Sequence, residues 1–380
     1  MSTAEGLEVR QVTSRRDRHD WLMLPFAVHG DDPAWVPPLL LAERQRISPR
    51  HNPFFTFGEA ALFLAYRAGR PVGRISAQVN RRHLAQHDDA TGQFGFFECH
   101  HDAEAASALV AAAARWLADR GLKRMQGPFS LSINEDVGLL VSGFESPPAI
   151  LTSHARPWYG PLLEQAGLAK AMDLYAYRMD PRSVPTRAHR LADLATQSSR
   201  VKVRSFDMKR YPSEVTLVFE IYNDAWSENW GFVPFSDAEI AALTRETRLF
   251  MRSEFGRIVE IDGKPAAMMV ILPDLNTIIR RFRGRLLPFN WMRLLHGIRF
   301  DRCTAARIAL LGLAKEHRTS PLGPAVLSLL ARETVALGQR YQLDWLEFSW
   351  VLETNRPMVA LAELAAGPPC KVYRVYQKPI

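Results

Sequence analysis

The sequence predicts a two-domain α/β (α+β) protein, and three observations indicate that class. The chain has 380 residues, of which 47% are hydrophobic and 10% aromatic, enough for two packed cores. Each half contains a predicted strand hairpin followed by a helix rich in Ala or Leu. The last eighty residues alternate strands and helices. We expect domains at 1–181 and 199–380, joined at 182–198 by a polar, proline-containing linker without a strand pattern.

The two halves repeat one plan, so we interpret the chain as a degenerate duplication. Each hairpin turns at a glycine-containing segment, 68–71 in the first half and 262–265 in the second. The repeated elements are the hairpin strands 61–66 and 72–79 with 258–261 and 266–272, the helices 103–120 and 325–338, and the closing strands 173–179 and 371–377. Each domain should be a mixed, largely antiparallel sheet flanked by helices.

The second half carries an additional element, which is also the main basic feature of the chain. From Gly263 to Arg340 it is 26 residues longer than its counterpart from Gly69 to Arg120. The segment 277–302 accounts for the difference. Its stretch 280–302 contains one acid, Asp301, against seven arginines, which supply most of the net charge of +8: Arg280, Arg281, Arg283, Arg285, Arg293, Arg299 and Arg302.

This basic insertion interleaves its arginines with leucines and aromatic residues. That composition is typical of an interfacial helix, whose apolar side chains enter a bilayer while its arginines reach anionic headgroups. The stretch 280–302 therefore predicts contact with an anionic membrane surface. Two alternatives are a solvated basic loop and a helix packed on its own domain, and an acidic acyl carrier protein could also dock there. We expect no nucleic acid partner, because one local patch in a nearly neutral chain is a small footprint.

Composition also limits the protein's location and cofactors. No run of about 18 apolar residues is present to span a membrane, and residues 1–6 lack the features of a signal peptide. The three cysteines, Cys99, Cys303 and Cys370, have no metal-ligand spacing, and neither His296 nor His317 has a partner at such spacing. We expect a cytoplasmic protein peripheral to the inner membrane, with no metal and no permanently bound cofactor.

A candidate phosphate-binding loop lies between the predicted strand 306–313 and the helix 325–338. The basic loop 315–324 leads into the start of that helix, where free N–H groups and the helix dipole favour an anion. The first-half counterpart, 97–104, is acidic and lacks glycine, so it should not hold a phosphate. These features place the expected catalytic site in the second half.

The strand, loop, helix and strand order resembles that of the GNAT acyltransferases, which bind coenzyme A at such a loop. Arg318 and Gly323 match the first and last positions of the family motif Arg/Gln-x-x-Gly-x-Gly/Ala, while Pro321 replaces its first glycine and removes one N–H donor. Asn355 matches the family's Asn beside the CoA arm. The resemblance implies acyl-CoA as co-substrate, held by Arg318, Thr319, Ser320, Leu322, Gly323 and Asn355. The family's acid tyrosine is missing from 359–362, so the resemblance moves that role to Tyr373 or Tyr376.

A closer resemblance covers almost the whole chain. The segments 127–130, 133–140, 222–226, 229–234 and 349–355 are similar to those of a group of bacterial two-domain GNAT-like proteins that includes the bacterial ceramide synthase. This resemblance implies transfer of a long-chain acyl group to the amine of a sphingoid base or a similar lipid amine. Two rival functions remain: a tandem GNAT transferase using acyl carrier protein or aminoacyl-tRNA, and a non-catalytic protein that binds acyl-CoA or lipid.

Glu347 and Glu353 are the candidate general bases, because an ammonium must lose a proton before it attacks a thioester. Strand alternation places Glu347, Ser349 and Val351 on one face. Glu347 could equally be a surface residue or a core carboxylate paired with an arginine. Glu353 is the stronger candidate, because it lies at the carboxyl end of its strand beside Asn355.

Two groups of residues are candidates for binding the acceptor. Amides, a carboxylate and tryptophans cluster before the second hairpin, at Asn223, Asp224, Trp226, Asn229 and Trp230. They suit an amine with a long tail, but they could instead form the capped end of a helix. Asn134 and Glu135 could line the interface between the domains, or they could cap a helix that starts at Asp136.

Overall fold

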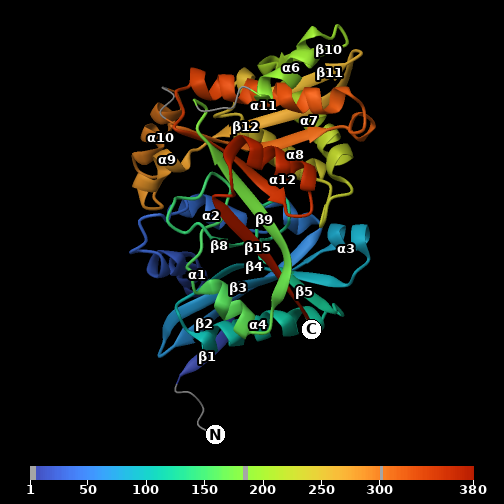
Figure 1. Cartoon of the computed structure of the whole chain (residues 1–380). Helices are drawn as coiled ribbons and strands as arrows, with labels where there is room; N and C mark the ends of the chain where they lie inside the picture. The colour runs from blue at the N-terminus through green and yellow to red at the C-terminus, as the bar shows by residue number, and fades with distance from the viewer. Residues whose placement is uncertain (1–5, 183–186, 300–302) are drawn as a thin grey trace. The chain divides into compact units, whose positions relative to one another are not determined.

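The computed structural model describes residues 6–182, 187–299 and 303–380 (Figure 1). Residues 183–186 of the expected linker, and Phe300, Asp301 and Arg302 of the basic insertion, lie outside this range. The chain forms two compact units. Unit 1 comprises residues 1–174, 279–291 and 371–380, and unit 2 comprises residues 175–278 and 292–370. None of the described helices is both long and apolar enough to cross a membrane.

Unit 1 is built on a mixed sheet with the strand order β1-β2-β3-β4-β5-β15, in which β8 also pairs with β15. All of these pairs are antiparallel except β4 with β5. Its strands are β1 (Leu7–Gln11), β2 (Gly58–Arg67), β3 (Arg70–Asn80), β4 (Thr91–Cys99), β5 (Arg124–Gly127), the small pair β6 (Phe129–Ser130) and β7 (Asp136–Val137), β8 (Leu139–Ser142) and β15 (Lys371–Pro379). Its helices are α1 (Arg15–Val28), α2 (Leu40–Arg46), α3 (Arg81–His87), α4 (Ala103–Ala118) and α5 (Tyr159–Gln165).

Helices α1 and α4 cover opposite faces of the unit 1 sheet. A side chain at Gly73 would meet Leu109 of α4, whereas its neighbour Arg74 donates to the carbonyl of Trp21 in α1 (2.8 Å). Successive strand residues point to opposite faces, so the two helices sandwich β3.

Unit 2 repeats this arrangement with the strand order β14-β13-β12-β11-β10. Its pairs are antiparallel except β13 with β14. The strands are β10 (Val201–Ser205), β11 (Gly256–Ile261), β12 (Lys264–Pro273), β13 (Ala305–Leu313) and β14 (Trp345–Leu352). The helices are α6 (Arg187–Gln197), α7 (Tyr211–Trp226), α8 (Asp237–Thr247), α9 (Asn276–Ile279), α11 (Leu322–Arg340) and α12 (Arg356–Ala366), while α10 (Asn290–Arg299) begins with the last two residues of the unit 1 segment 279–291.

Helices α7 and α11 lie on opposite faces of β13. A side chain at Gly312 would meet Ala225 of α7, and one at Gly323 of α11 would meet Leu313, the next residue of β13. The predicted duplication is therefore confirmed: each unit has an antiparallel hairpin, a parallel strand pair and a helix on each face.

Both predicted hairpins form, and their turns have the same geometry. Ala68 and Gly69 have φ values of 49° and 73°, and Asp262 and Gly263 have φ values of 52° and 76°. Two successive positive φ angles define the type I′ turn, which matches the twist of a two-residue hairpin. The glycines therefore mark the same turn in both halves.

The closing strands are divided between the units in a way that the sequence does not indicate. The C-terminal strand β15 belongs to unit 1, where Tyr376 pairs with Gly127 of β5. Strand β9 (Ala169–Met179) begins in unit 1, but its segment Tyr175–Met179 belongs to unit 2. The units are therefore interleaved along the chain, whereas the predicted domain boundaries at 181 and 199 cut it once.

Two local expectations differ from the structure. No helix starts at Asp136, which instead lies in β7 and pairs with Ser130. The carboxylates of Glu135 and Asp136 bind the guanidinium of Arg46, at 2.9 Å and 2.7 Å, so they face an arginine and not a helix end. The segment expected as a linker contains α6, whose Ala192 and Ala195 pack on α11.

The basic insertion lies between β12 and β13, where it forms α9, a short 3₁₀ turn (Arg280–Phe282) and α10. The corresponding connection in unit 1, between β3 and β4, contains only α3. Gly297 allows α10 to pack closely on Ile278 of α9. The opposite side of α10 leaves Trp291, Met292 and Leu295 between 43% and 46% exposed.

Candidate acyltransferase site

The candidate site in unit 2 begins where the parallel strands β13 and β14 separate. Their pairing runs only from Ala305 opposite Trp345 to Ile308 opposite Phe348. On its other edge, β13 has a bulge at Ala309, because Val270 pairs with Leu310 whereas the next residue of β12, Ile271, pairs with Ile308. Bulges bend a strand and redirect its backbone groups. The carboxyl halves of β13 and β14 do not pair with each other, so a ligand could lie between them. In open sheets, ligands usually bind at the carboxyl ends of the strands.

The predicted phosphate loop follows β13 and leads into α11. The N–H of Ser320 donates to the carbonyl of His317 (3.2 Å), and the N–H of Gly323 donates to that of Ser320 (3.0 Å). A side chain at Gly323 would come within 2.5 Å of the carbonyl oxygen of His317, so only glycine fits this turn. Within the described chain, the N–H groups of Thr319 and Leu322 have no such backbone partner, so they are available to an anion.

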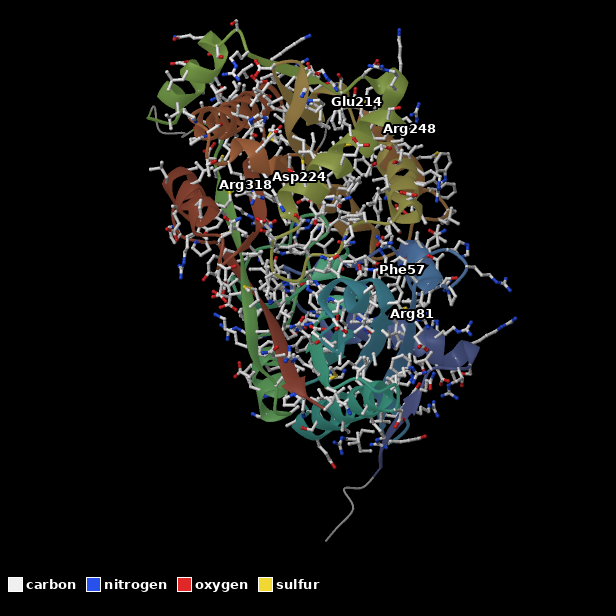
Figure 2. The ribbon with its side chains drawn as sticks, turned by 90° about the vertical axis from the view of Figure 1, so that its right-hand side faces the viewer. Phe57, Arg81, Glu214, Asp224, Arg248 and Arg318 are labelled. Carbon is white, nitrogen blue, oxygen red and sulfur yellow. The ribbon has the colours of Figure 1, made fainter. Side chains whose placement is uncertain are left out.

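Arg318 already has protein partners, as does its neighbour Lys315. The guanidinium of Arg318 donates to the carbonyl of Ala225 and lies 3.5 Å from the carboxylate of Glu228. The ammonium of Lys315 lies 3.1 Å from the same carboxylate. Figure 2 shows Arg318 beside the end of α7, near Asp224. Glu228 is 68% exposed, so an incoming phosphate can compete with it for both cations.

A surface hollow of about 480 Å³ lies next to this loop, between α7 and the end of β13. It is lined by Leu217, Glu220, Ile221, Asp224, Pro265, Ala314, Lys315 and Glu316, and we call it the α7 hollow. Asp224 accepts a hydrogen bond from the backbone N–H of Lys315 (2.8 Å), which fixes its carboxylate at the rim. The α7 hollow combines carboxylates with apolar side chains, a combination that suits an ammonium attached to an apolar chain.

Glu347 lies in a buried network at the other edge of β13. Its side chain is fully buried. The carboxylate accepts one hydrogen bond from Nε of Arg178 (2.9 Å) and another from the hydroxyl of Ser349 (2.9 Å). Arg307 extends the network by donating from Nε to the same hydroxyl (2.9 Å) and from Nη2 to the carbonyl of Ser349 (3.1 Å). The Ser349 bond confirms that Glu347 and Ser349 share a face. The ion pair with Arg178 fits the alternative in which Glu347 is a core carboxylate paired with an arginine.

Glu353 and Asn355 follow the end of β14. Glu353 is half-buried. The side chain of Asn355 accepts from the N–H of Met358 (3.4 Å) and so caps α12. Capping fixes the position of Asn355 at the mouth of the separated strands.

The predicted acceptor residues occupy the end of α7 and the turn after it. Trp226 donates from its indole to the carbonyl of Leu311 in β13 (3.4 Å) and stacks on Tyr222 at 5.0 Å. The amide oxygen of Asn223 is buried and has no hydrogen-bond partner among the described residues. Asn229 and the half-buried Trp230 lie in the turn that follows, where the N–H of Asn229 donates to Trp226 (2.8 Å).

The other candidate residues belong to unit 1. Glu135 binds Arg46, as described above, and also accepts from the amide of Asn52 (3.2 Å), while the N–H of Asn134 donates to the hydroxyl of Ser132 (3.0 Å). Tyr373 and Tyr376 are buried in β15. The hydroxyl of Tyr376 donates to Glu164 (3.1 Å). Burial, together with the charge of this carboxylate, raises the pKa of Tyr376.

The loop of unit 1 that corresponds to the phosphate loop is occupied by carboxylates. Asp102 caps α4 by accepting from the N–H of Ala105 (3.0 Å) and pairs with Arg67 (2.8 Å). A phosphate at this helix start would meet that negative charge.

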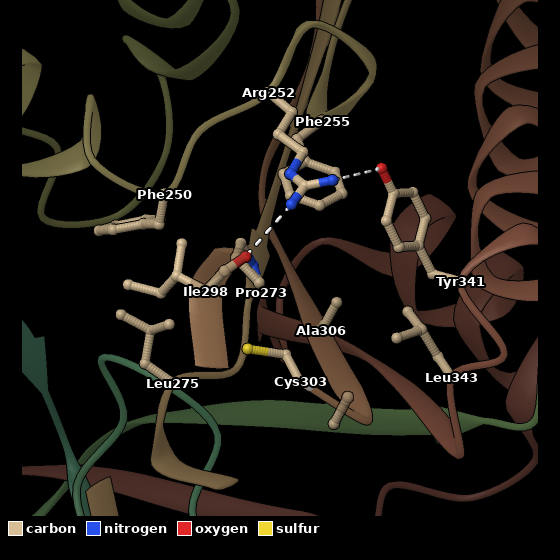
Figure 3. Close-up of a pocket in the computed structure, with 11 residues that line it drawn as sticks. Phe250, Arg252, Phe255, Pro273, Leu275, Ile298, Cys303, Ala306, Tyr341 and Leu343 are labelled. Atoms are coloured by element: carbon tan, nitrogen blue, oxygen red, sulfur yellow. Dashed lines mark hydrogen bonds between the residues drawn. The ribbon is translucent and has the colours of Figure 1, made fainter. Parts of the chain in front are cut away.

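A second, apolar cavity in unit 2 lies at the opposite end of β13, near Ala305 and Ala306 (Figure 3). It measures about 20 Å³, room for about one water molecule. Arg252 lines it and donates to the carbonyl of Ile298 (3.2 Å) and to the hydroxyl of Tyr341 (3.5 Å). It is therefore distinct from the candidate site.

The structure adds four residues to the site that the sequence analysis missed: Arg178, Arg307, Glu228 and Ala309. Arg307 had a visible signal, since it is the one charged residue in an otherwise apolar strand, whereas the strand of Arg178 also contains Lys170 and Asp173. The bulge at Ala309 and the position of Glu228 had none, because they depend on pairing between distant segments.

The fold is that of the tandem GNAT proteins. It matches the solved structure of a tandem GNAT protein from the clavulanic acid biosynthesis pathway over 98% of both chains, with a TM-score of 0.57 and 14% identity. It also matches a GCN5-related N-acetyltransferase from Sphaerobacter thermophilus over 98% of this chain and 95% of that one, with a TM-score of 0.53 and 11% identity. No family model matches the chain.

Among curated proteins, the bacterial ceramide synthase of Caulobacter vibrioides is 38% identical over 99% of this chain and 98% of its own length. Protein YghO of Escherichia coli is 35% identical over 100% of this chain and 97% of its own. The chain belongs to the family of the bacterial ceramide synthase and is an acyltransferase. The resemblance noted in the sequence is thus confirmed at the level of family, fold and reaction class.

Proposed function

We propose that the protein transfers a long-chain acyl group from acyl-CoA to the amine of a sphingoid base or a similar lipid amine. The observation that carries the proposal is the separation of β13 from β14 after Ile308, with a helix start following one strand and Glu353 following the other. A thioester between the two strands would have an anion site on one side and a base on the other. The name of the Caulobacter vibrioides relative supports a sphingoid-type acceptor.

The CoA pyrophosphate would bind at the start of α11. The N–H groups of Thr319 and Leu322 would donate to it, and the helix dipole would add to their attraction for an anion. Arg318 would turn from Glu228 to the phosphate. Pro321 leaves this cradle one donor short, so we expect the acyl chain to contribute much of the donor's affinity through burial of apolar surface.

The acceptor would bind in the α7 hollow. Its ammonium would lie near the carboxylates of Asp224 and Glu220, and its apolar chain would follow Leu217 and Ile221. The unpartnered amide oxygen of Asn223 could accept from a hydroxyl of the acceptor, since a buried acceptor without a partner costs free energy.

In the proposed reaction, Glu353 removes a proton from the ammonium, and the free amine attacks the thioester carbonyl to form the C–N bond. Backbone N–H groups near the Ala309 bulge stabilise the negative charge on the carbonyl oxygen. The intermediate then breaks its C–S bond, and the proton that remains on its nitrogen passes to the departing sulfur, which leaves the amide and the CoA thiol. We assign Glu347 a positioning role, because Arg178 already neutralises its charge.

The basic insertion would hold the enzyme on an anionic membrane, where both substrates partition. Leu287 and Phe289 are 67% and 66% exposed and precede the exposed apolar side of α10. Arg285, Arg293 and Arg299 are exposed in the same segment. Each arginine near an anionic surface contributes about 1 kcal/mol, and the apolar side chains add burial in the headgroup region.

The first test is thiol release from palmitoyl-CoA by the full chain, with and without sphinganine in detergent micelles. Amine-dependent release with an amide product in mass spectrometry would support the proposal. Release that ignores the amine, or binding of palmitoyl-CoA without release across several amines, would overturn it. If the amide product forms only when the acyl group is supplied on acyl carrier protein, the donor is that protein and not acyl-CoA.

Glu353→Gln tests the base. We expect kcat to fall by about 10²–10⁴, the usual contribution of a general base, with palmitoyl-CoA affinity unchanged. Glu363→Gln, an exposed carboxylate in α12, is the matched control and should keep full activity. An equal loss of kcat and of donor affinity in Glu353→Gln would argue against the role.

Co-sedimentation with vesicles tests the membrane surface. The double variant Phe289→Ser/Met292→Ser should bind vesicles of phosphatidylcholine and phosphatidylserine more weakly than the parent. Leu249→Ser removes an apolar side chain that is 72% exposed outside the insertion, so it should bind as the parent does. Equal vesicle binding by all three proteins would exclude this surface.

A further inference from the structure

Three polar side chains converge in the interior of unit 1, away from the site described above. His29 ends α1, Asp32 lies in the turn that follows, and His154 lies in the loop before α5. Their side chains are 0%, 12% and 2% exposed. One ligand atom from each, an imidazole nitrogen or a carboxylate oxygen, lies within 4.8 Å of the other two.

We propose that His29, Asp32 and His154 bind a divalent transition-metal ion of the zinc class. Two imidazoles and one carboxylate are ligands that zinc accepts, and three protein ligands leave a fourth position for water. The acyl-transfer proposal uses none of these three residues, so the metal site can be tested independently of it.

The hydrogen bonds of His29 favour this role. Its Nε2 lies 2.8 Å from Oε2 of Glu98, a carboxylate that also accepts from the hydroxyl of Tyr159 (2.6 Å). A carboxylate in this position holds the proton on Nε2 and leaves the lone pair on Nδ1. Nδ1 of His29 is buried and has no hydrogen-bond partner among the described residues. An imidazole with one nitrogen held by a carboxylate and the other unpartnered has the arrangement of a metal-ligating histidine.

His154 presents its Nε2 to Asp32. This nitrogen lies 2.9 Å from Oδ2 of Asp32, and a cation bound between the two atoms would replace their hydrogen bond. At Nδ1 of His29, the same cation would satisfy a buried acceptor that lacks a partner among the described residues.

The charges around the cluster are compatible with a cation. Oδ1 of Asp32 accepts from the N–H of Ala34 (2.9 Å), and Arg156 lies 3.7 Å from Oδ2. Arg156 also pairs with the exposed Asp31, and Arg74 lies 3.7 Å from Glu98. The three carboxylates balance these two arginines and Lys371, whose charge also acts on His154, so the groups around the cluster present no net positive charge to a cation.

A metal here would act as a structural clamp. It would join the end of α1 to a loop 122 residues further along the chain than Asp32. Residues this far apart have no ligand spacing in the sequence, which is why the sequence analysis expected no metal.

Metal content and affinity test the proposal on the full chain. We expect one zinc per chain by elemental analysis after chelator treatment, zinc loading and dialysis. Cobalt should bind in the same ratio with a visible absorption band, and zinc should raise the unfolding temperature. Asp32→Asn should weaken cobalt binding at least tenfold, and Glu98→Gln should weaken it by about 10–100-fold, as loss of a supporting carboxylate does at other sites.

Asp31→Asn is the matched control, because this neighbouring carboxylate also pairs with Arg156 but is 83% exposed. It should bind cobalt as the parent does. The proposal is overturned if the parent binds no stoichiometric cobalt or zinc, or if Asp31→Asn and Asp32→Asn lose affinity equally. The zinc-dependent rise in unfolding temperature of the parent decides the matter if Asp32→Asn does not fold. No rise would mean that the histidines form a hydrogen-bonded network only.

Discussion

Replacing Glu347 with Gln separates a structural role of this carboxylate from a catalytic one. Glu347 is fully buried and makes two short contacts, to Arg178 and to the hydroxyl of Ser349, both at 2.9 Å. Gln keeps the volume and one acceptor oxygen but removes the negative charge. Arg178 then remains a cation in unit 2 with only 17% of its side chain exposed.

The size of the loss follows from these contacts. Removing one partner of a buried ion pair costs about 3–5 kcal/mol. Gln retains one hydrogen bond, and water reaches part of Arg178, so we expect the free energy of unfolding of unit 2 to fall by about 2–3 kcal/mol. That change corresponds to a factor of about 30–150 in the unfolding equilibrium.

Urea denaturation followed by tryptophan fluorescence measures this change at the site. Arg178 lies 4.1 Å from the ring of Trp345, and Arg307 lies 4.5 Å from that of Trp350, so two indoles report on the network. Glu363→Gln, on the exposed side of α12, should leave the midpoint unchanged. A loss below about 0.5 kcal/mol, the size of an ordinary surface substitution, would refute the network as a stabilising element.

Three further predictions concern the loop and the fold. Gly323→Ala should lower the affinity for palmitoyl-CoA about tenfold or more in calorimetry, because the new carbon would lie 2.5 Å from the carbonyl oxygen of His317. Unchanged affinity would mean that the donor binds elsewhere. Glu228→Gln should strengthen the same binding about two- to fivefold by releasing Arg318 and Lys315, and weaker binding would contradict that competition. The hydrogen bond from the Ser14 hydroxyl holds the pKa of Asp17 below its ordinary value, so its contribution to stability is present above about pH 4 and is lost as the pH falls further. Asp17→Asn should therefore be less stable than the parent at pH 7 in thermal unfolding and should match it near pH 2, and a gap that persists at pH 2 would contradict this assignment.

Much of the fold could be predicted because its signals are local. The hairpin turns follow from Gly69 and Gly263, whose positive φ angles glycine adopts readily. The alternative of a capped helix at Asp136 did not hold, because a carboxylate at a possible helix start can bind an arginine instead of a helix end. Arg46, which binds Asp136 and Glu135, lies 89 residues before Glu135 in the chain.

The candidate site was predicted only in part, for the same reason. The loop 318–323 and Asn355 could be found by position, because each lies next to a recognisable strand. The partner of Glu347 could not, since Arg178 is 169 residues away. The metal cluster escaped prediction in the same way, with Asp32 and His154 far apart in the sequence.

The sequence by itself determined the elements of this protein: two copies of a hairpin, a parallel pair and a covering helix, with a basic insertion in the second. The tertiary structure alone decided how those elements were shared. Strand β15 joins the sheet of unit 1, and the last residues of β9 belong to unit 2. The physical reason is that a strand's backbone N–H and C=O groups are the same whichever neighbour they pair with, so its sequence specifies its faces and not its sheet. The choice is made by packing of side chains from distant segments.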